Sequence, residues 1–140
     1  MEDHLKNHVI VCGYGLAGEK IVEILMQHGI KFVVIEIDPN KIKEVEEKKI
    51  ECIHGDATSS STLEKAGIED AKAIAIAMDD DAKNLFTLIT AKSLNDKIVV
   101  VTRANDEFIK SKLEDAGANF VATPNKSVSD EIIRELSGIG

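Results

Sequence analysis

The chain has 140 residues, which is enough for one domain with a single core. It is 44% hydrophobic and 30% charged and has only two prolines, which is typical of a folded globular protein and argues against a disordered or fibrous chain. Its formal net charge of -8 argues against nucleic acid as a partner, because the two would repel each other. No apolar run approaches the roughly 20 residues that span a bilayer, so we expect a soluble protein.

Neither the cysteines nor the histidines are spaced like metal ligands. Cys12 and Cys52 lie within apolar runs and have no CxxC or Cys/His pattern around them, which indicates buried thiols in a reducing cytosol. The four histidines share no spacing that suits zinc. We therefore expect a cytoplasmic protein with no metal site.

Six short runs rich in β-branched residues alternate with amphipathic stretches, which predicts parallel strands joined by crossover helices. The strands are expected at residues 8–12, 32–36, 51–54, 73–77, 98–103 and 120–122, after a linker of residues 1–7. Several of them are nearly continuous apolar runs, as strands covered on both faces require. Right-handed crossovers then imply the strand order 3-2-1-4-5-6. We therefore predict a Rossmann-like, doubly wound α/β fold with a parallel sheet, in a single domain over residues 8–140.

Capping residues mark where the predicted helices begin and end. Asp38 stands before a proline, which is typical of a helix start, because the carboxylate caps the first turn and proline suits the first helical position. The candidate caps of the third and fourth helices are Thr58 or Ser59, and Asp79 or Asp80. Helix ends are expected at Gly29, Gly67 and Gly117. A last helix is predicted over about residues 127–137, with an apolar stripe at Val128, Ile132, Ile133 and Leu136.

A glycine-rich turn lies between the first predicted strand and helix. Its residues Gly13, Tyr14, Gly15, Leu16, Ala17 and Gly18 match the pattern GxGxxG in the context that a dinucleotide site requires. There Gly13 permits the tight turn, Gly15 lets a pyrophosphate approach the backbone, and Gly18 lets the helix pack close to the strand. The helix N-terminus would offer free N–H groups and a positive dipole to phosphate. The alternative is a turn that is kept for packing alone in a fold that has lost its ligand.

Two carboxylates follow the second predicted strand. Glu36 lies 18 residues beyond Gly18, close to the roughly 20-residue offset of the acid that binds ribose hydroxyls in dinucleotide sites. A carboxylate there also repels a 2′-phosphate, which favours NAD over NADP, although Lys41 nearby is a counterweight. Asp38 competes for the ribose, but its place before a proline fits a helix cap better. We therefore assign the ribose contact to Glu36.

The ends of the next three strands supply further candidate ligand contacts. Asp56 and Ala57 follow the third strand, where a carboxylate can accept a hydrogen bond from the adenine amine; stabilising its own turn is an equal alternative for Asp56. Ala77 ends the fourth strand, and the aspartates at 79–81 mark the next helix start, with a cation site as the less favoured alternative. Arg103 ends the fifth strand and could reach a phosphate, or form a salt bridge with one of these carboxylates.

No set of residues in the sequence forms a catalytic constellation. The only tyrosine, Tyr14, lies inside the glycine turn, and four residues later stands Gly18 rather than the lysine of a short-chain dehydrogenase. All six strand–helix units are used in the nucleotide-binding fold, which leaves no domain to hold a substrate. We therefore predict a binding domain that is not an enzyme. The alternative is the NAD-binding half of an oxidoreductase that lacks its substrate domain.

Five segments, in the order HVIVCGYGLAG, VVIEIDP, GDAT, LEKAGIEDAKAIAIAMDDD and LEDAGANFVATP, together with the strand that ends in Arg103, form a specific combination. In this combination the chain resembles the N-terminal lobe of RCK domains, also called KTN or TrkA-N domains, which regulate potassium channels and transporters. The resemblance covers essentially the whole chain. It implies that the three glycines hold phosphates, that Glu36 holds the adenosine ribose, and that Asp56 lies beside the adenine.

The resemblance further implies a regulatory domain that binds NAD(H), or else AMP, ADP or ATP, and gates potassium movement through a membrane-embedded channel or transporter pore. Some transporter-type members carry an arginine in the glycine turn for terminal phosphates, where this chain has Leu16 and Ala17, so we expect NAD(H) rather than ATP. Family members pair as dimers and assemble into rings, commonly through the last helix. We therefore expect a homodimer at the inner face of the cell membrane. The second, C-terminal lobe that is usual in the family is missing from this sequence.

Overall fold

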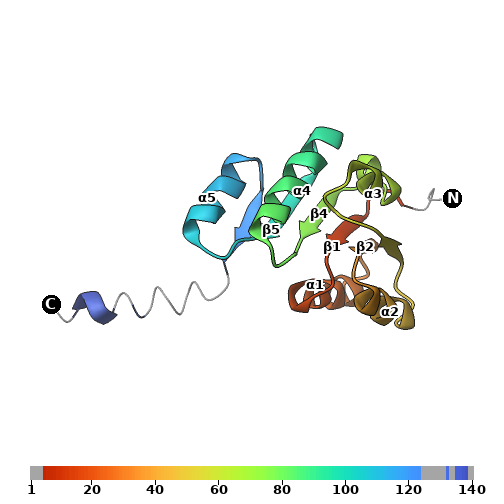
Figure 1. Ribbon diagram of the computed structural model, residues 1–140, viewed down its shortest axis with the longest axis horizontal. Coiled ribbons are helices and arrows are strands. Elements are labelled where there is room, and N and C mark those ends of the chain that lie inside the picture. The colour runs from red at the N-terminus through yellow and green to blue at the C-terminus, as the bar shows by residue number, and fades with distance from the viewer. Residues whose placement is uncertain (1–4, 124–131, 133–134, 139–140) are drawn as a thin grey trace.

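The computed structural model describes residues 5–123, 132 and 135–138 (Figure 1). In this part of the chain, six parallel strands form one sheet in the order β3-β2-β1-β4-β5-β6. The strands are β1 (Val9–Cys12), β2 (Phe32–Glu36), β3 (Cys52–His54), β4 (Ala73–Ile76), β5 (Val99–Arg103) and β6 (Phe120–Ala122). The predicted fold is therefore confirmed, together with its strand order.

The observed strands agree with the predicted ones to within one residue at each end. The residues that fall outside are His8, Glu51, Ala77 and Ile98. Ile98 is not part of β5 because its N–H donates to the Asn95 carbonyl (3.2 Å) and so closes the preceding turn. Ala77 still donates its N–H to the Cys12 carbonyl of β1 (3.0 Å), which places it at the carboxyl end of the sheet, where ligands bind in open α/β sheets.

Helices cover both faces of the sheet (Figure 1). One face carries α1 (Leu16–Gln27) and α2 (Pro39–Glu47), and the other carries α3 (Ser60–Lys65), α4 (Asp81–Leu94) and α5 (Glu107–Asp115), with a short 3-10 helix, η1 (Ile68–Asp70), between α3 and β4. Alternate residues of strands β1 to β4 supply the two cores, as the period of two requires. In β1, Ile10 faces the core under α3 to α5, whereas Val11 faces the core under α1 and α2.

The edge of the sheet formed by β5 and β6 is covered on one face only. Val100 and Val121 are buried beneath α4 and α5, while Val99 and Phe120 on the opposite face are 44% and 62% exposed. Parallel strands are usually covered on both faces. The side of the sheet that carries α1 and α2 therefore has an apolar area over β5 and β6 that the described residues leave exposed.

The predicted caps are found, with one difference. Asp38 accepts a hydrogen bond from the Asn40 N–H (2.8 Å) at the start of α2, and Asp80, of the two candidates, accepts one from the Lys83 N–H (3.0 Å) at the start of α4. Ser59 takes the cap position of α3 but makes no side-chain capping bond. The glycines at the expected helix ends, Gly29, Gly67 and Gly117, all have positive φ angles.

The predicted last helix, at about residues 127–137, falls largely outside the described residues. Its described positions, 132 and 135–138, are helical, and Ile132 and Leu136 of the expected stripe are 54% and 59% exposed. Among the described helices, none combines the length and the apolar character needed to cross a membrane.

Candidate functional site

A cleft of about 330 Å³ lies above the carboxyl ends of the strands, where the strand order reverses between β1 and β4. Eight of the residues predicted for the site line it: Gly13, Tyr14, Gly15, Glu36, Asp38, Asp56, Ala57 and Ala77. Four do not: Leu16, Ala17, Gly18 and Arg103. The strand order thus brings together residues from four different strand ends, which are far apart in the sequence.

The three glycines of the turn are required for different reasons. Gly13 has a φ of +96°, which side chains rarely adopt, and a Cβ there would lie 3.1 Å from the Ala77 carbonyl oxygen. A Cβ on Gly18 would overlap the Gly13 carbonyl oxygen, so α1 can approach β1 only without a side chain at this position. Gly15 has an ordinary φ of -78°, and a Cβ there would meet no atom within 4 Å in the part of the chain that the structure describes. The fold therefore explains Gly13 and Gly18 but does not explain Gly15.

The N-terminus of α1 differs from those of the other long helices. Helices α2, α4 and α5 each have an aspartate at the N-cap position whose side chain accepts a backbone hydrogen bond. The N-cap of α1 is Gly15, which has no side chain to do so. Its first N–H groups, those of Leu16 and Ala17 among them, thus lack the carboxylate that the other helices have. An uncapped helix start beside a cleft is suited to binding an anion, because its N–H groups and its dipole both favour negative charge.

The Glu36 carboxylate is held by backbone N–H groups at the end of β2. Its Oε1 accepts from the Tyr14 N–H (2.7 Å), and its Oε2 accepts from the N–H groups of Ile37 (2.9 Å) and Asp38 (3.0 Å). A carboxylate has about four acceptor positions, so one remains for a ligand hydroxyl. Asp38 also lines the cleft, but its Oδ1 caps α2. The preference for Glu36 over Asp38 as the ribose ligand is compatible with this arrangement and remains a prediction.

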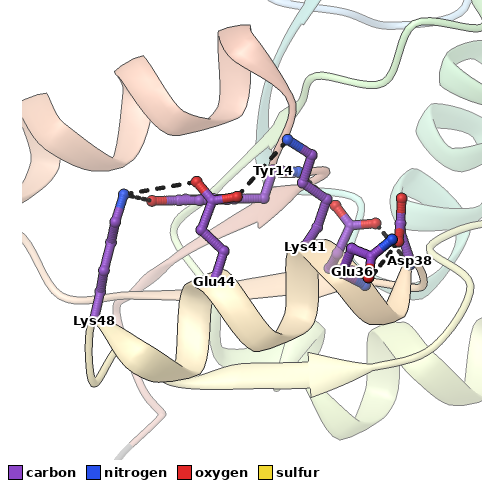
Figure 2. Close-up of polar contacts among 7 residues, drawn as sticks. Tyr14, Glu36, Asp38, Lys41, Glu44 and Lys48 are labelled. Carbon is purple, nitrogen blue, oxygen red and sulfur yellow. Dashed lines mark hydrogen bonds and ion pairs between the residues drawn. The ribbon is translucent and has the colours of Figure 1, made fainter.

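The Tyr14 side chain links the glycine turn to α2 (Figure 2). It is 1% exposed, and its hydroxyl accepts a hydrogen bond from Lys48 Nζ (3.1 Å), which raises the pKa of Lys48. Glu44 lies between Lys41 and Lys48 on the same side of α2, with Nζ–Oε distances of 3.8 and 3.9 Å. Sequence reasoning missed this connection because Tyr14 and Lys48 are 34 residues apart and neither belongs to a spacing motif.

The loop after β3 forms the opposite side of the cleft. Asp56 Oδ1 accepts hydrogen bonds from the N–H (2.9 Å) and the hydroxyl (2.7 Å) of Thr58. These two bonds, with a smaller contribution from the nearby charge of Lys83, lower the pKa of Asp56. Asp56 therefore does stabilise its own turn, as one alternative held. Because both bonds use Oδ1, Oδ2 remains for a ligand such as the adenine amine.

Asn84 fixes the segment between β4 and α4. Its buried amide donates to the Met78 carbonyl (2.9 Å) and accepts from the Met78 N–H (3.2 Å), so both backbone groups of Met78 are paired. This role is a second one that the sequence did not reveal, since asparagine within an amphipathic helix gives no pattern. The bonds position Met78 and Asp79, which line the cleft beside Ala77.

Arg103 is turned toward the aspartates that start α4. Its guanidinium donates to Asp79 Oδ1 (3.0 Å), and Asn105 donates to Asp81 Oδ2 (3.1 Å). The structure thus shows the salt bridge that was one alternative for Arg103, while a phosphate contact by this residue stays a prediction. Among the described residues, no group of three or more histidine, cysteine, aspartate or glutamate side chains is arranged to hold a metal ion.

Comparison with known proteins identifies the family. The family profile of the TrkA-N domain matches residues 9–124. The chain belongs to the TrkA-N domain family. Potassium channel protein 1 of Methanocaldococcus jannaschii is 41% identical over 122 residues, which cover 86% of this TrkA-N chain and 37% of that protein. The resemblance seen in the sequence motifs is therefore confirmed. The chain spans little more than a third of this relative's length.

Solved structures agree with this assignment. The C-terminal domain of Kef from Shewanella denitrificans in its AMP-bound form has a TM-score of 0.78 and 25% identity, and the match covers 96% of this TrkA-N chain and 82% of that one. The GsuK channel bound to NAD has a TM-score of 0.79 at 20% identity, covering 87% of this chain and 22% of that one. The second likeness shows the fold alone. These TrkA-N relatives occur in potassium channel and Kef proteins.

Proposed function

We propose that this TrkA-N domain binds NAD(H), or a related adenine nucleotide, in the cleft, and that the bound ligand regulates potassium movement through a channel or transporter pore. The observation that carries the proposal is the open space beside Gly15. None of the described residues occupies the space that a side chain would take there, yet the position faces the cleft beside an uncapped helix. Space of this kind suits a diphosphate that must approach the backbone closely.

The rest of the cleft supports an adenosine on the side of β2 and β3. The free acceptor position of Glu36 suits one ribose hydroxyl, and Oδ2 of Asp56 suits the adenine amine. In a doubly wound fold, the second half of a dinucleotide then lies over β4, next to Ala77 and Met78. The negative charge of Glu36 favours a ribose without a 2′-phosphate, and hence NAD over NADP.

The proposed role is binding without chemistry. The hydroxyl of Tyr14 is engaged by Lys48, and its side chain is buried under α2, so it is not available to a substrate in the cleft. Relatives in potassium channel and Kef proteins support a regulatory role for the domain beside a membrane pore, at the inner face of the cell membrane. In such a role, the ligand must bind two states of the protein with different affinities.

We further propose that the domain pairs with a second copy. Apolar side chains are exposed on the described surface at Phe86 and Ile89 of α4, Phe108 of α5, and Val99 and Phe120 of the sheet. Exposed apolar residues in such numbers often mark protein interfaces. Light scattering coupled to size exclusion should give twice the monomer mass; the monomer mass at micromolar concentrations would contradict pairing.

Isothermal titration calorimetry tests nucleotide binding directly. The wild-type domain should bind NAD+, NADH, AMP and ADP at up to millimolar concentrations, and NADP at least about tenfold more weakly than NAD+, because Glu36 opposes the extra phosphate. Gly15→Asp should abolish binding while the domain stays folded. Gly138→Asp is the matched control, because it adds the same charged side chain at a glycine whose Cβ would also meet no atom of the described residues within 4 Å. The binding proposal is wrong if the wild type binds none of these ligands, or if Gly15→Asp binds them as the wild type does.

The regulatory part needs the full-length protein that carries the domain. Rubidium flux into liposomes should depend on the nucleotide added to the side where the domain lies, and this dependence should disappear in Gly15→Asp. A flux that ignores nucleotide in a wild-type protein that binds it would leave binding intact but overturn the regulatory role.

A further inference from the structure

The cleft has two walls. The first wall consists of the glycine turn and the ends of β2 and α2; the second consists of the loop after β3 and the start of α4. These walls belong to elements on opposite faces of the sheet (Figure 1). A ligand whose phosphates rest on the glycine turn would therefore have the second wall on its other side.

Helix α4 cannot attract an anion through its N-terminus. Asp80 caps it through the Lys83 N–H (3.0 Å), and Asp81 adds a second carboxylate in the first turn, so the positive end of the helix dipole is already compensated. Asp79 of the same segment is paired with Arg103 at 3.0 Å. The backbone of the second wall thus contributes little that would hold a phosphate.

Two lysines line the cleft, and they lie on different walls. Lys41 is on α2, close to Glu36, and its Nζ is 3.8 Å from Glu44 Oε2. Lys83 is exposed in the first turn of α4, and none of the ion pairs between described residues includes it. Its charge is close enough to Asp56 across the loop to contribute to the lowered pKa of that carboxyl. Lys83 is therefore a cation at the cleft without a close partner of its own.

We propose that Lys83 is a phosphate-binding residue that contacts the ligand from the wall opposite the glycine turn and makes affinity depend on the number of phosphates. The inference rests on the proposed nucleotide function. The glycine turn offers backbone N–H groups but no side-chain charge, since Leu16 and Ala17 stand where a basic residue would be needed. Among the described residues that line the far side of the cleft, Lys83 is the one cation that a diphosphate would meet. An ammonium group suits this role because it binds phosphate as a point charge and needs no fixed geometry.

The solvent exposure of Lys83 sets how much affinity its loss should cost. Lys83 is solvent-exposed, so its contact with a phosphate is screened, and its loss should weaken binding of ADP or NAD+ by about fivefold to tenfold. AMP should lose less, because its single phosphate rests on the glycine turn. Adenosine has no phosphate and should bind Lys83→Met as it binds the wild type. The difference between ADP and adenosine should shrink at higher ionic strength.

Calorimetry with adenosine, AMP, ADP and NAD+ on the wild type, Lys83→Met and Lys65→Met tests the proposal. Lys65 is exposed on α3 and does not line the cleft, so its variant matches the change in net charge without touching the site. The expected result is a loss that grows with phosphate number in Lys83→Met and is absent in Lys65→Met. An equal loss for adenosine and ADP, no loss at all, or the same loss in Lys65→Met would overturn the role of Lys83. A wild type that binds none of the ligands would instead overturn the proposed function, and the role of Lys83 with it.

Thermal denaturation of the free proteins provides the folding check. Lys83→Met changes an exposed side chain, so its melting temperature should stay close to that of the wild type. Lys83→Arg keeps the charge and should retain most of the ADP affinity. If Lys83→Arg binds ADP as weakly as Lys83→Met, the residue does not act through its charge and the proposal fails.

Discussion

The three glycines of the turn should separate into two that the fold needs and one that the ligand needs. Gly18→Ala places a methyl group on the Gly13 carbonyl oxygen and 2.8 Å from the carbonyl carbon, both of which are backbone atoms that cannot rotate away. Helix α1 must then move away from the turn. Overpacking costs about 1–3 kcal/mol, and a clash with fixed backbone atoms belongs at the upper end of this range, while alanine gains up to about 1 kcal/mol over glycine in a helix. We expect a net loss of about 2 kcal/mol in the free energy of unfolding.

This loss translates into a measurable change in melting temperature. The entropy of unfolding is about 2.1 cal/mol/K per residue, so a domain of 140 residues loses roughly 7 °C for 2 kcal/mol. Gly13→Ala should show a comparable loss, because its φ is +96° and its Cβ would lie 3.1 Å from the Ala77 carbonyl oxygen. Gly15→Ala should stay within about 0.5 kcal/mol of the wild type. It should nevertheless weaken nucleotide binding by at least about tenfold, because the methyl group keeps the diphosphate from the backbone.

Differential scanning calorimetry of the free variants, followed by titration with ADP, measures both quantities. Gly138→Ala is the control for a glycine replaced in open space, and it should change neither. The reasoning would be refuted by a Gly15→Ala variant that melts as early as Gly18→Ala, since Gly15 would then be a packing residue. A stable Gly15→Ala variant with unchanged affinity would equally show that the space beside Gly15 is not used.

Four further outcomes follow from the contacts described above. Glu36→Gln should lower the free energy of unfolding by about 1–3 kcal/mol in thermal melts, because its amide would turn an NH₂ toward backbone N–H donors. Asn84→Leu should cost about 3 kcal/mol in urea unfolding, because both backbone groups of Met78 lose their partner. Burial raises the pKa of Cys52 to about 11, so at about pH 8.5 its thiol should react with a disulfide reagent more slowly than a free cysteine, whose thiol is half ionised there. The Thr58 hydrogen bonds lower the pKa of Asp56, so the contribution of this carboxylate to stability is complete at neutral pH and is lost below about pH 4. The melting temperatures of the wild type and Asp56→Asn should therefore converge below about pH 4. A difference in melting temperature that does not change with pH would contradict this.

The fold was accessible from the sequence because local signals and topology rules agree. Near-continuous apolar strands such as 98–103 and caps such as Asp38 mark the elements, and handedness then leaves one order for the sheet. The glycine pattern and the offset of Glu36 were accessible for the same reason, since both follow the chain within one strand–helix–strand unit. The observed strand ends differ from the predicted ones by one residue where a hydrogen bond in a turn competes with strand pairing. An example is the bond from the Ile98 N–H to the Asn95 carbonyl.

The parts of the site that the sequence did not reveal depend on contacts between distant segments. Lys48 meets Tyr14 because α2 packs against the glycine turn, and Asn84 meets Met78 because α4 folds back on the end of β4. Lysine and asparagine are common on helices, and nothing in their spacing separates a structural contact from a solvated side chain. The role of Arg103 was open for a related reason, since only packing decides between a carboxylate and a ligand.

The hydrogen bonds of Glu36 have a consequence for how the domain could transmit a signal. Three backbone N–H groups hold this carboxylate without any help from a ligand, so the fold alone sets its position at the end of β2. Lys83 lies on the other wall of the cleft, exposed in the first turn of α4. The same helix exposes Phe86 and Ile89 on its outer surface. If a bound phosphate attracts Lys83, as proposed above, the force acts on a helix that also carries an exposed apolar surface, so α4 rather than β2 is the element through which ligand binding would reach a partner.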